Sequence, residues 1–242
     1  MCYLQEAEEI YAEQQTVAKD FIAVLKEGLD MDNGRINNNI NKIEKLIANF
    51  KARNIEVNYF ETIKDTENQI LTLVPIEVAV GIGHSATLEK MDITKALNNR
   101  GNIVFDKELA KDKEECKVLK KKALLADWYI TGSNAISVDG RIVNVDHSGN
   151  RVAAINFGPE NVIIVVGVNK IVDTWEEAIN RVKNIACPLN AKRAGFNPPC
   201  VELNKCVDCT STERVCNSLS IIEGQSVKGR IKVFIVNEDL GF

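Results

Sequence analysis

The sequence lacks the long apolar runs that mark membrane-spanning helices. No run reaches the roughly 18 apolar residues that such a helix needs, and the opening residues MCYLQEAEE have neither the basic segment nor the apolar core of a signal peptide. Basic residues do not form a stripe either: the net charge is −4 and the run 120–122 is expected to be a solvated helix face. These absences argue against a membrane span, a signal peptide and a nucleic-acid partner.

Histidine is scarce, and the familiar catalytic motifs are missing. The chain has two histidines, His84 and His147, and both fall in predicted turns where they could transfer protons or be plain surface residues. No Ser-His-Asp arrangement, Walker loop or internal repeat is found. The pair Gly81 and Gly83 lacks the third glycine of a dinucleotide fingerprint. Sequence motifs alone therefore do not assign a standard enzyme class.

Cysteine, in contrast, is concentrated near the C-terminus. Four of the seven cysteines, Cys200, Cys206, Cys209 and Cys216, follow the spacing C-x5-C-x2-C-x6-C. The central C-x-x-C pair lets two sulfurs reach one metal from a single turn, and the outer two can close the shell. Four thiolates at this spacing suit an iron–sulfur cluster or a structural zinc, with disulfides as a third reading.

The remaining cysteines are isolated in sequence. We interpret Cys2, Cys116 and Cys187 as ordinary small apolar residues. An odd, clustered set of thiols fits a reducing cytoplasm better than a secreted disulfide framework. Because Pro198 and Pro199 precede the cluster, we expect it to begin as an ordered loop rather than a helix.

The apolar periodicity predicts one α/β domain over residues 1–242, with an N-terminal helical segment 1–53 and a cysteine-rich loop 187–217. The stripe of the first helix could pack on the core or make a homodimer contact. Helices are expected at 4–25, 36–53, 61–72, 107–126 and 174–186. Strands are expected at 55–59, 76–80, 103–105, 162–166 and 230–236, and residues 128–136 are expected to form a strand, a turn and a second strand. Asp139 and Gly140 indicate a hairpin turn.

Polar residues follow several of these strands, where ligands bind in open α/β sheets. The loop from Gly83 through Ser85 to Thr87 could cradle a phosphate or carboxylate, or be only a capped turn. The proposed anion crevice also includes Asn134, Asn150, Arg151, Asn169, Asn190 and Arg193. His84 and Lys170 are its candidates for catalysis.

Seven runs in the chain resemble the lactate-utilisation (LUD domain) family. They are VGIGHSATL (80–88), TGSNAI (131–136), DGRIVN (139–144), GNRVAA (149–154), FGP (157–159), GVNKIV (167–172) and PLNAKR (188–193). The resemblance extends from about residue 13 to the C-terminus. Here His84 stands inside the glycine loop, where the family often has a small residue.

The resemblance implies a parallel-sheet fold of the NagB/RpiA/CoA-transferase-like group, whose isomerase members hold a sugar phosphate on a similar loop. It also implies action with iron–sulfur partner proteins in oxidising L-lactate to pyruvate, and a [4Fe–4S] cluster on the cysteine tail. Three hypotheses follow: an iron–sulfur protein of 2-hydroxy-acid metabolism, a non-redox isomerase or hydro-lyase, or a module that senses a small acid.

Overall fold

The computed structural model describes residues 33–242, with side chains from residue 41 onward. Two compact units are distinguished, residues 1–45 and 46–242. The expected helix at 4–25 lies outside the described residues. The expected helix at 36–53 is present as α2 (Asn33–Lys51), which runs across the boundary between the units. The α/β architecture described below belongs to the second unit.

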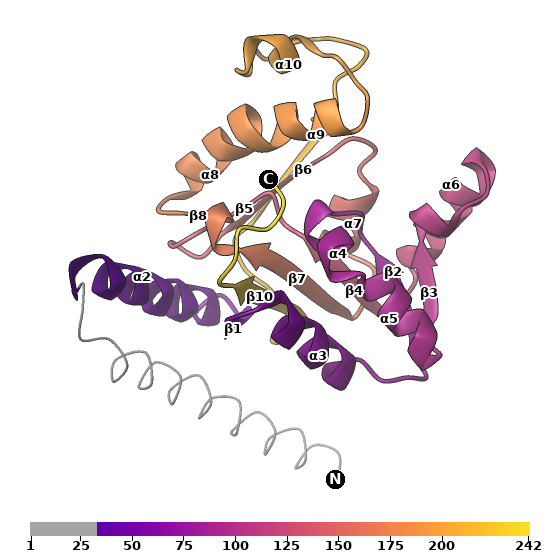
Figure 1. Cartoon of the computed structure of the whole chain (residues 1–242), viewed down its shortest axis with the longest axis horizontal. Coiled ribbons are helices and arrows are strands. Elements are labelled where there is room, and N and C mark those ends of the chain that lie inside the picture. Colours follow the sequence, from indigo (N-terminus) through magenta and orange to yellow (C-terminus); the bar gives the residue numbers. More distant parts are fainter. Residues whose placement is uncertain (1–32) are drawn as a thin grey trace, which may run out of the picture. The chain divides into compact units, whose positions relative to one another are not determined.

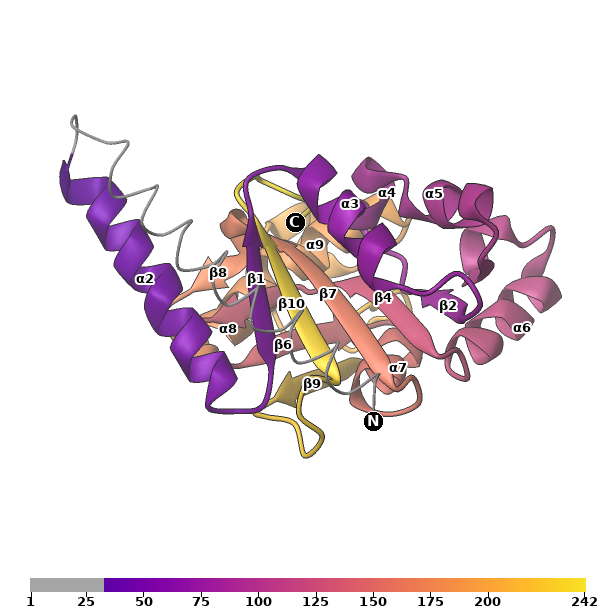
Figure 2. The same cartoon turned by 90° about the horizontal axis from the view of Figure 1, so that it is seen from below.

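The main sheet has six parallel strands in the order β1-β10-β7-β4-β2-β3. Figure 2 displays β1, β10, β7 and β4 side by side. The predicted α/β fold with a parallel sheet is therefore confirmed. The strands are β1 (Glu56–Phe60), β2 (Ala79–Ile82), β3 (Ile103–Asp106), β4 (Trp128–Gly132), β7 (Asn161–Gly167) and β10 (Ile231–Val236).

A second sheet of mixed direction was not foreseen from the sequence. Its order is β8-β5-β6-β9, with the bounds β5 (Ala135–Ser137), β6 (Ile142–Asp146), β8 (Ile171–Val172) and β9 (Ser218–Ile222). The predicted Asp139-Gly140 turn joins β5 and β6, which pair antiparallel. Gly140 adopts a φ of 90°, which side chains other than glycine rarely tolerate.

Three apolar clusters bury the faces of these sheets. Helices α3 (Ile63–Leu73), α4 (Ala86–Met91) and α5 (Ile93–Arg100) cover one face of the main sheet (Figures 1 and 2). The other face packs against the second sheet, with α6 (Lys113–Ala123) and α7 (Asn150–Asn156) at its margin. The far face of the second sheet is covered by α8 (Trp175–Arg181) and the residues that follow it.

The helix expected at 174–186 continues without a break to residue 193. It consists of α8, a π-helical segment η3 (Val182–Ala186) and α9 (Cys187–Arg193). Pro188 has no N–H to donate to the carbonyl of Asn184, and in a regular α-helix its ring would collide with that carbonyl. The wider π turn relieves that conflict, and such turns are frequent at functional sites.

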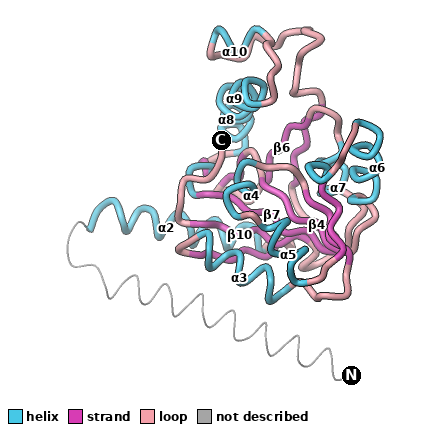
Figure 3. The backbone as a smooth tube through the Cα atoms, turned by 45° about the vertical axis from the view of Figure 1, so that its right-hand side comes forward, coloured by secondary structure: helices cyan, strands magenta, loops and turns pink. Residues whose placement is uncertain are grey.

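The expected loop over 187–217 is therefore partly helical. It contains α9 and also α10 (Pro199–Leu203), which lies outside α9 in Figures 1 and 3. The expectation that the prolines would prevent a helix before the cysteines was wrong. Pro199 occupies the first helical position, where its fixed φ is favourable and its missing N–H costs nothing.

Short 3-10 turns precede α6 and β8, namely η1 (Lys107–Leu109) and η2 (Val168–Lys170). The helix expected at 107–126 is thus divided between η1 and α6. Among residues 33–242, the structure contains no helix with the length and apolarity that crossing a membrane requires.

Candidate functional site

Five cysteines line one cavity of about 150 Å³, beneath α10 and beside α9. They are the four predicted ligands Cys200, Cys206, Cys209 and Cys216, together with Cys187. All five are free thiols, so the disulfide reading does not describe this state of the protein. The cavity is far above the roughly 10–15 Å³ that one water molecule needs, and therefore has room for a centre of several atoms.

Arg214 and Asn184 brace the cysteine segment. The Arg214 guanidinium donates to the carbonyl of Cys209 at 2.8 Å and to that of Cys216 at 3.2 Å. The Asn184 side chain, from the π-helical segment, accepts a hydrogen bond from the backbone N–H of Cys206 at 2.9 Å. These contacts fix the backbone that carries three of the sulfurs, and they place one positive charge beside them.

The thiols influence one another's ionisation. A hydrogen bond from Cys187, helped by Arg214, lowers the pKa of Cys216 to about 6. The same bond, together with burial, raises the pKa of Cys187. Burial raises the pKa of Cys200. The pair therefore holds one proton on Cys187 and favours thiolate at Cys216, the form that binds metals.

The donor set fits a thiolate-ligated metal centre in type, burial and available volume. The fit does not extend to a preassembled cage, since no three His, Cys, Asp or Glu side chains in the described part of the chain converge on a single ion position. The interpretation of Cys187 as an isolated apolar residue was incomplete. It is buried in an apolar cluster with Ala178 and Val182, yet it also faces the other sulfurs.

Lys170 lies at the carboxyl end of the main sheet, just after β7. Its side chain is buried, and its ammonium donates to the hydroxyl of Thr87 at 3.1 Å. Burial, with the positive charges of Arg181 and Arg151, lowers the pKa of Lys170 to about 7. Lys170 and Thr87, expected to face one crevice, therefore lie in contact.

The C-terminal segment 240–242 covers this pair. Thr87 donates its hydroxyl to the carbonyl of Leu240 at 3.4 Å. Asn169 holds the segment from the other side, accepting from the Leu240 N–H at 3.1 Å and donating to the Gly241 carbonyl at 3.3 Å. A side chain at Gly241 would lie 3.2 Å from the Lys170 nitrogen, so glycine permits this close approach.

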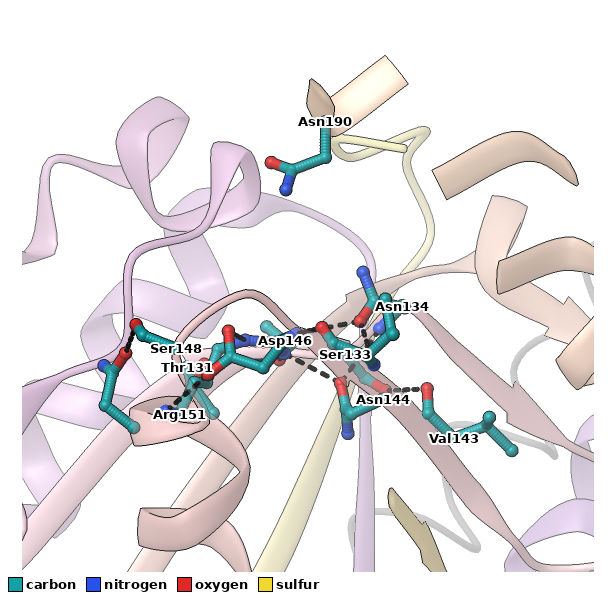
Figure 4. A network of polar contacts seen from close by, with 12 residues as sticks. Thr131, Ser133, Asn134, Val143, Asn144, Asp146, Ser148, Arg151 and Asn190 are labelled. Carbon is teal, nitrogen blue, oxygen red and sulfur yellow. Dashed lines mark hydrogen bonds and ion pairs between the residues drawn. The ribbon is translucent and has the colours of Figure 1, made fainter. Parts of the chain in front are cut away.

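Arg151 and Asn134 belong to a buried polar network (Figure 4). The Arg151 guanidinium donates to the Gly132 carbonyl at 2.9 Å, to Asn144 at 2.7 Å, to Asn134 at 2.8 Å and to the Val145 carbonyl at 2.7 Å. Its donors are thus spent on holding β4, β6 and α7 together. Arg151 acts on the crevice through the positions of its neighbours and through its charge.

Asn144 carries an orphaned polar group in that network. Its side-chain oxygen accepts from Arg151 and from the Asn134 N–H, which fixes the orientation of the amide. The Asn144 Nδ2 group is buried and has no hydrogen-bond partner among the described residues. A water molecule is the simplest partner for such a group.

His84 and Arg193 lie in contact. An Arg193 N–H points at His84 Nε2 at 2.5 Å, and His84 Nδ1 lies 3.2 Å from Glu108. His84 Nε2 also lies 3.1 Å from the Glu89 carboxylate. Burial, followed by the charges of Lys107 and Arg193, lowers the pKa of His84 and favours the neutral imidazole.

The other residues predicted for the crevice make contacts in different parts of the structure. Asn190 accepts from Arg193 at 3.0 Å and points from α9 towards the network of Asn134 (Figure 4). Asn150 lies at the start of α7, where it accepts from Ser148 at 2.8 Å, away from the Lys170 contacts. Arg181, which the sequence did not single out, donates to the carbonyls of Asn134 at 2.7 Å and Asn169 at 3.2 Å.

Ser85 depends on a glycine for its place. Its hydroxyl accepts from the Thr87 N–H at 3.2 Å and caps α4, packed against Gly132 of β4.

Gly132→Ala would drive a methyl group into the Ser85 hydroxyl. We expect a loss of roughly 1–3 kcal/mol of stability, measured by denaturant unfolding. Gly224→Ala is the matched control, because its new methyl would come no nearer than 3.3 Å to any neighbouring atom, against 2.3 Å from the Ser85 hydroxyl at Gly132, and an equal loss there would contradict the packing argument.

One helical run connects the cysteine cavity with the crevice. Arg181 contacts the crevice, Val182 and Cys187 line the cavity, and Arg193 reaches the His84 loop. Cys187 and Arg193 are separated by roughly 9 Å of helix rise. The same helical run therefore carries Cys187 of the cavity and the contacts of Arg181 and Arg193.

The structure thus combines an α/β fold with a thiol-lined cavity and with the buried basic side chains of Arg151, Lys170 and Arg181. The LUD domain model matches residues 43–236, and the chain belongs to the LUD domain family. Among solved structures, it is similar to the crystal structure of a DUF162 family protein from Deinococcus radiodurans, with 17% identity and a TM-score of 0.47, covering 81% of this chain and 97% of that one. No curated protein matches.

Proposed function

We propose that this LUD-domain protein is a cytoplasmic iron–sulfur protein of 2-hydroxy-acid metabolism, supporting electron transfer in the oxidation of L-lactate to pyruvate. The observation that supports the proposal is that five free cysteines line one cavity. Cys200, Cys206, Cys209 and Cys216 are the proposed ligands of a [4Fe–4S] cluster, since iron–sulfur clusters are held by cysteine thiolates. Family membership links the chain to lactate utilisation.

Arg214 has a defined part in this proposal. Its guanidinium donates to the carbonyls of Cys209 and Cys216 and brings a positive charge close to the sulfurs. Charge and hydrogen bonds around the sulfurs set the reduction potential of a cluster. When bound, the cluster supplies one-electron transfer. Lactate oxidation releases two electrons and two protons, so iron–sulfur partner proteins are proposed to accept the electrons.

Lys170 and Thr87 are the proposed anion site. An ammonium and a hydroxyl within 3.1 Å of one another can both contact one carboxylate oxygen once the 240–242 segment moves aside. A carboxylate would stabilise the charged lysine, so binding near pH 8 is expected to take up a proton. Calorimetry with L-lactate in two buffers of different ionisation enthalpy measures that uptake, and Lys170→Met should abolish it.

The metal assignment is tested by anaerobic purification of the full chain. We expect a brown protein with about four iron and four sulfide per chain, and a paramagnetic signal after reduction. Cys209→Ala should remove the colour and both elements. Cys116→Ala, in α6 and outside the cavity, is the control and should keep them. One zinc per chain without sulfide would contradict the iron–sulfur assignment.

A second candidate function is supported by the pKa of Lys170. A lysine with a pKa of about 7 is neutral enough at physiological pH to abstract a proton, as an isomerase or hydro-lyase requires. Incubating the chain with a 2-hydroxy acid in D₂O, without an electron acceptor, separates the two functions. Deuterium at Cα that depends on Lys170 would favour the non-redox enzyme, whereas electron transfer predicts no such exchange.

A further inference from the structure

Three cationic side chains are buried near one another at the carboxyl end of the main sheet. Lys170, Arg181 and Arg151 are 3%, 7% and 9% exposed. Both arginines donate to Asn134, and their charges act on Lys170. Among the described residues, the only carboxylate paired with any of the three is Asp146, which lies 3.9 Å from Arg151. The ammonium of Lys170 therefore has no carboxylate partner in the described part of the chain.

This environment favours the uncharged form of the Lys170 side chain. Taking an ammonium out of water without a counter-charge costs far more than taking out the neutral amine. Two nearby guanidinium groups add to that cost, because arginine stays protonated. The lowered pKa of Lys170, about 7, agrees with this reasoning. A neutral amine carries a lone pair, and lysines activated by burial and by neighbouring cations attack carbonyl groups.

The surroundings of the amine indicate which carbonyl compound suits it. The Thr87 hydroxyl, 3.1 Å from the amine nitrogen, can exchange protons with a reacting oxygen. Arg181 donates to the carbonyl of Asn169, the residue before Lys170, so its unpaired charge lies close to the amine. A carboxylate next to the reacting carbonyl would supply the negative charge that these cations lack. A small acid with adjacent carbonyl and carboxylate groups meets both requirements.

We infer that Lys170 binds a small 2-oxo acid covalently, as an imine between its Nζ atom and the carbonyl carbon of the acid. The choice of acid rests on the proposed function, because pyruvate is the product of L-lactate oxidation. As for the binding of lactate, the segment 240–242 has to move aside first, since Gly241 lies close to the amine.

The reaction needs no oxidant or reductant. The amine nitrogen forms a bond to the carbonyl carbon, and the carbonyl oxygen takes one proton from the nitrogen. The resulting carbinolamine then breaks its C–O bond, and the oxygen leaves as water with the second amine proton. Thr87 is positioned to pass these protons between nitrogen and oxygen. The acid keeps its carboxylate, which remains beside the buried arginines.

Reductive trapping on the full chain tests the imine. The chain is incubated with pyruvate and sodium cyanoborohydride at pH 7, which converts an imine into a stable secondary amine, and the modified lysines are located by peptide mass spectrometry. Lys170 should be labelled at least about tenfold faster than the exposed Lys64, whose amine is almost fully protonated at this pH. Labelling that is absent from Lys170, or no faster there than at Lys64, would overturn the inference.

Variants and a second acid complete the test. Lys170→Met should lose the fast label, whereas Lys64→Met should keep it. Thr87→Val should slow the labelling of Lys170 several-fold, and Thr87→Ser should restore it. L-Lactate has no carbonyl group to attack, so it should give no label and should protect Lys170 from pyruvate.

The outcomes separate this inference from the proposed function. Proton uptake with L-lactate that depends on Lys170, without a label from pyruvate, overturns the imine and supports the proposed anion site. A fast label on Lys170 in a chain that purifies without iron and sulfide supports the imine and overturns the electron-transfer function. Absence of both the label and the proton uptake overturns the imine together with the anion site.

Discussion

Replacing Lys170 with methionine is expected to remove a large part of the pH dependence of stability between pH 7 and pH 10. The folded chain binds the Lys170 proton with a pKa of about 7, while the unfolded chain binds it near the ordinary value of 10.5. Between these values the unfolded state carries more protons, so the stability contributed by this site rises with pH. The wild-type advantage over the variant should grow by roughly 3–4 kcal/mol across this range.

Denaturant unfolding of the wild type and of Lys170→Met at pH 7 and pH 10 gives the difference between their unfolding free energies at each pH. The titration of other groups affects both proteins and largely cancels in this difference. Lys64, with 67% of its side chain exposed, is the matched control. Lys64→Met should change the unfolding free energy by nearly the same small amount at pH 7 and pH 10. A pH-independent difference for Lys170→Met would show that the ammonium is not buried as described.

The second large effect is expected at Arg151. Arg151→Met would remove the Arg151 donor from the carbonyls of Gly132 and Val145. The amide oxygens of Asn134 and Asn144 would keep only their backbone donors. Breaking a buried charged network of this kind costs roughly 3–5 kcal/mol. We expect a loss of that size in the free energy of unfolding, measured by guanidinium denaturation.

Arg141 offers the comparison, because its guanidinium pairs with Asp139 and Glu223 near the surface. Arg141→Met should cost about 1 kcal/mol or less, as is usual for exposed ion pairs. Equal losses in the two variants would mean that the Arg151 network contributes no more than a surface contact. Because Arg151 also positions Asn134, its variant should weaken lactate binding, whereas the Arg141 variant should not.

Local signals in the sequence predicted much of the main sheet. The β-branched run 162–166 became the centre of β7, buried on both faces as expected of a parallel strand. Thr174 caps α8 by accepting from the Glu177 N–H at 3.3 Å. The Glu177 carboxylate in turn accepts a hydrogen bond from the Asp173 N–H at 2.9 Å.

The features that sequence reasoning missed depend on long-range pairing. Strand β9 has only weak alternation, and it forms because β6 offers it an antiparallel edge. Cys187 looked isolated because a helix and a loop separate it from Cys216 along the chain. The one available signal was Pro188, whose position inside an apolar periodic run indicated a distorted helix near the cysteines.

The cover that Leu240 and Gly241 form over Lys170 has a kinetic consequence. For the acid binding proposed at Lys170, residues 240–242 would have to move away first, and the apparent affinity would be lowered by the fraction of open molecules. At high acid concentration the observed association rate should stop rising and level off at the opening rate. Shortening the chain before Leu240 should restore a linear dependence on concentration.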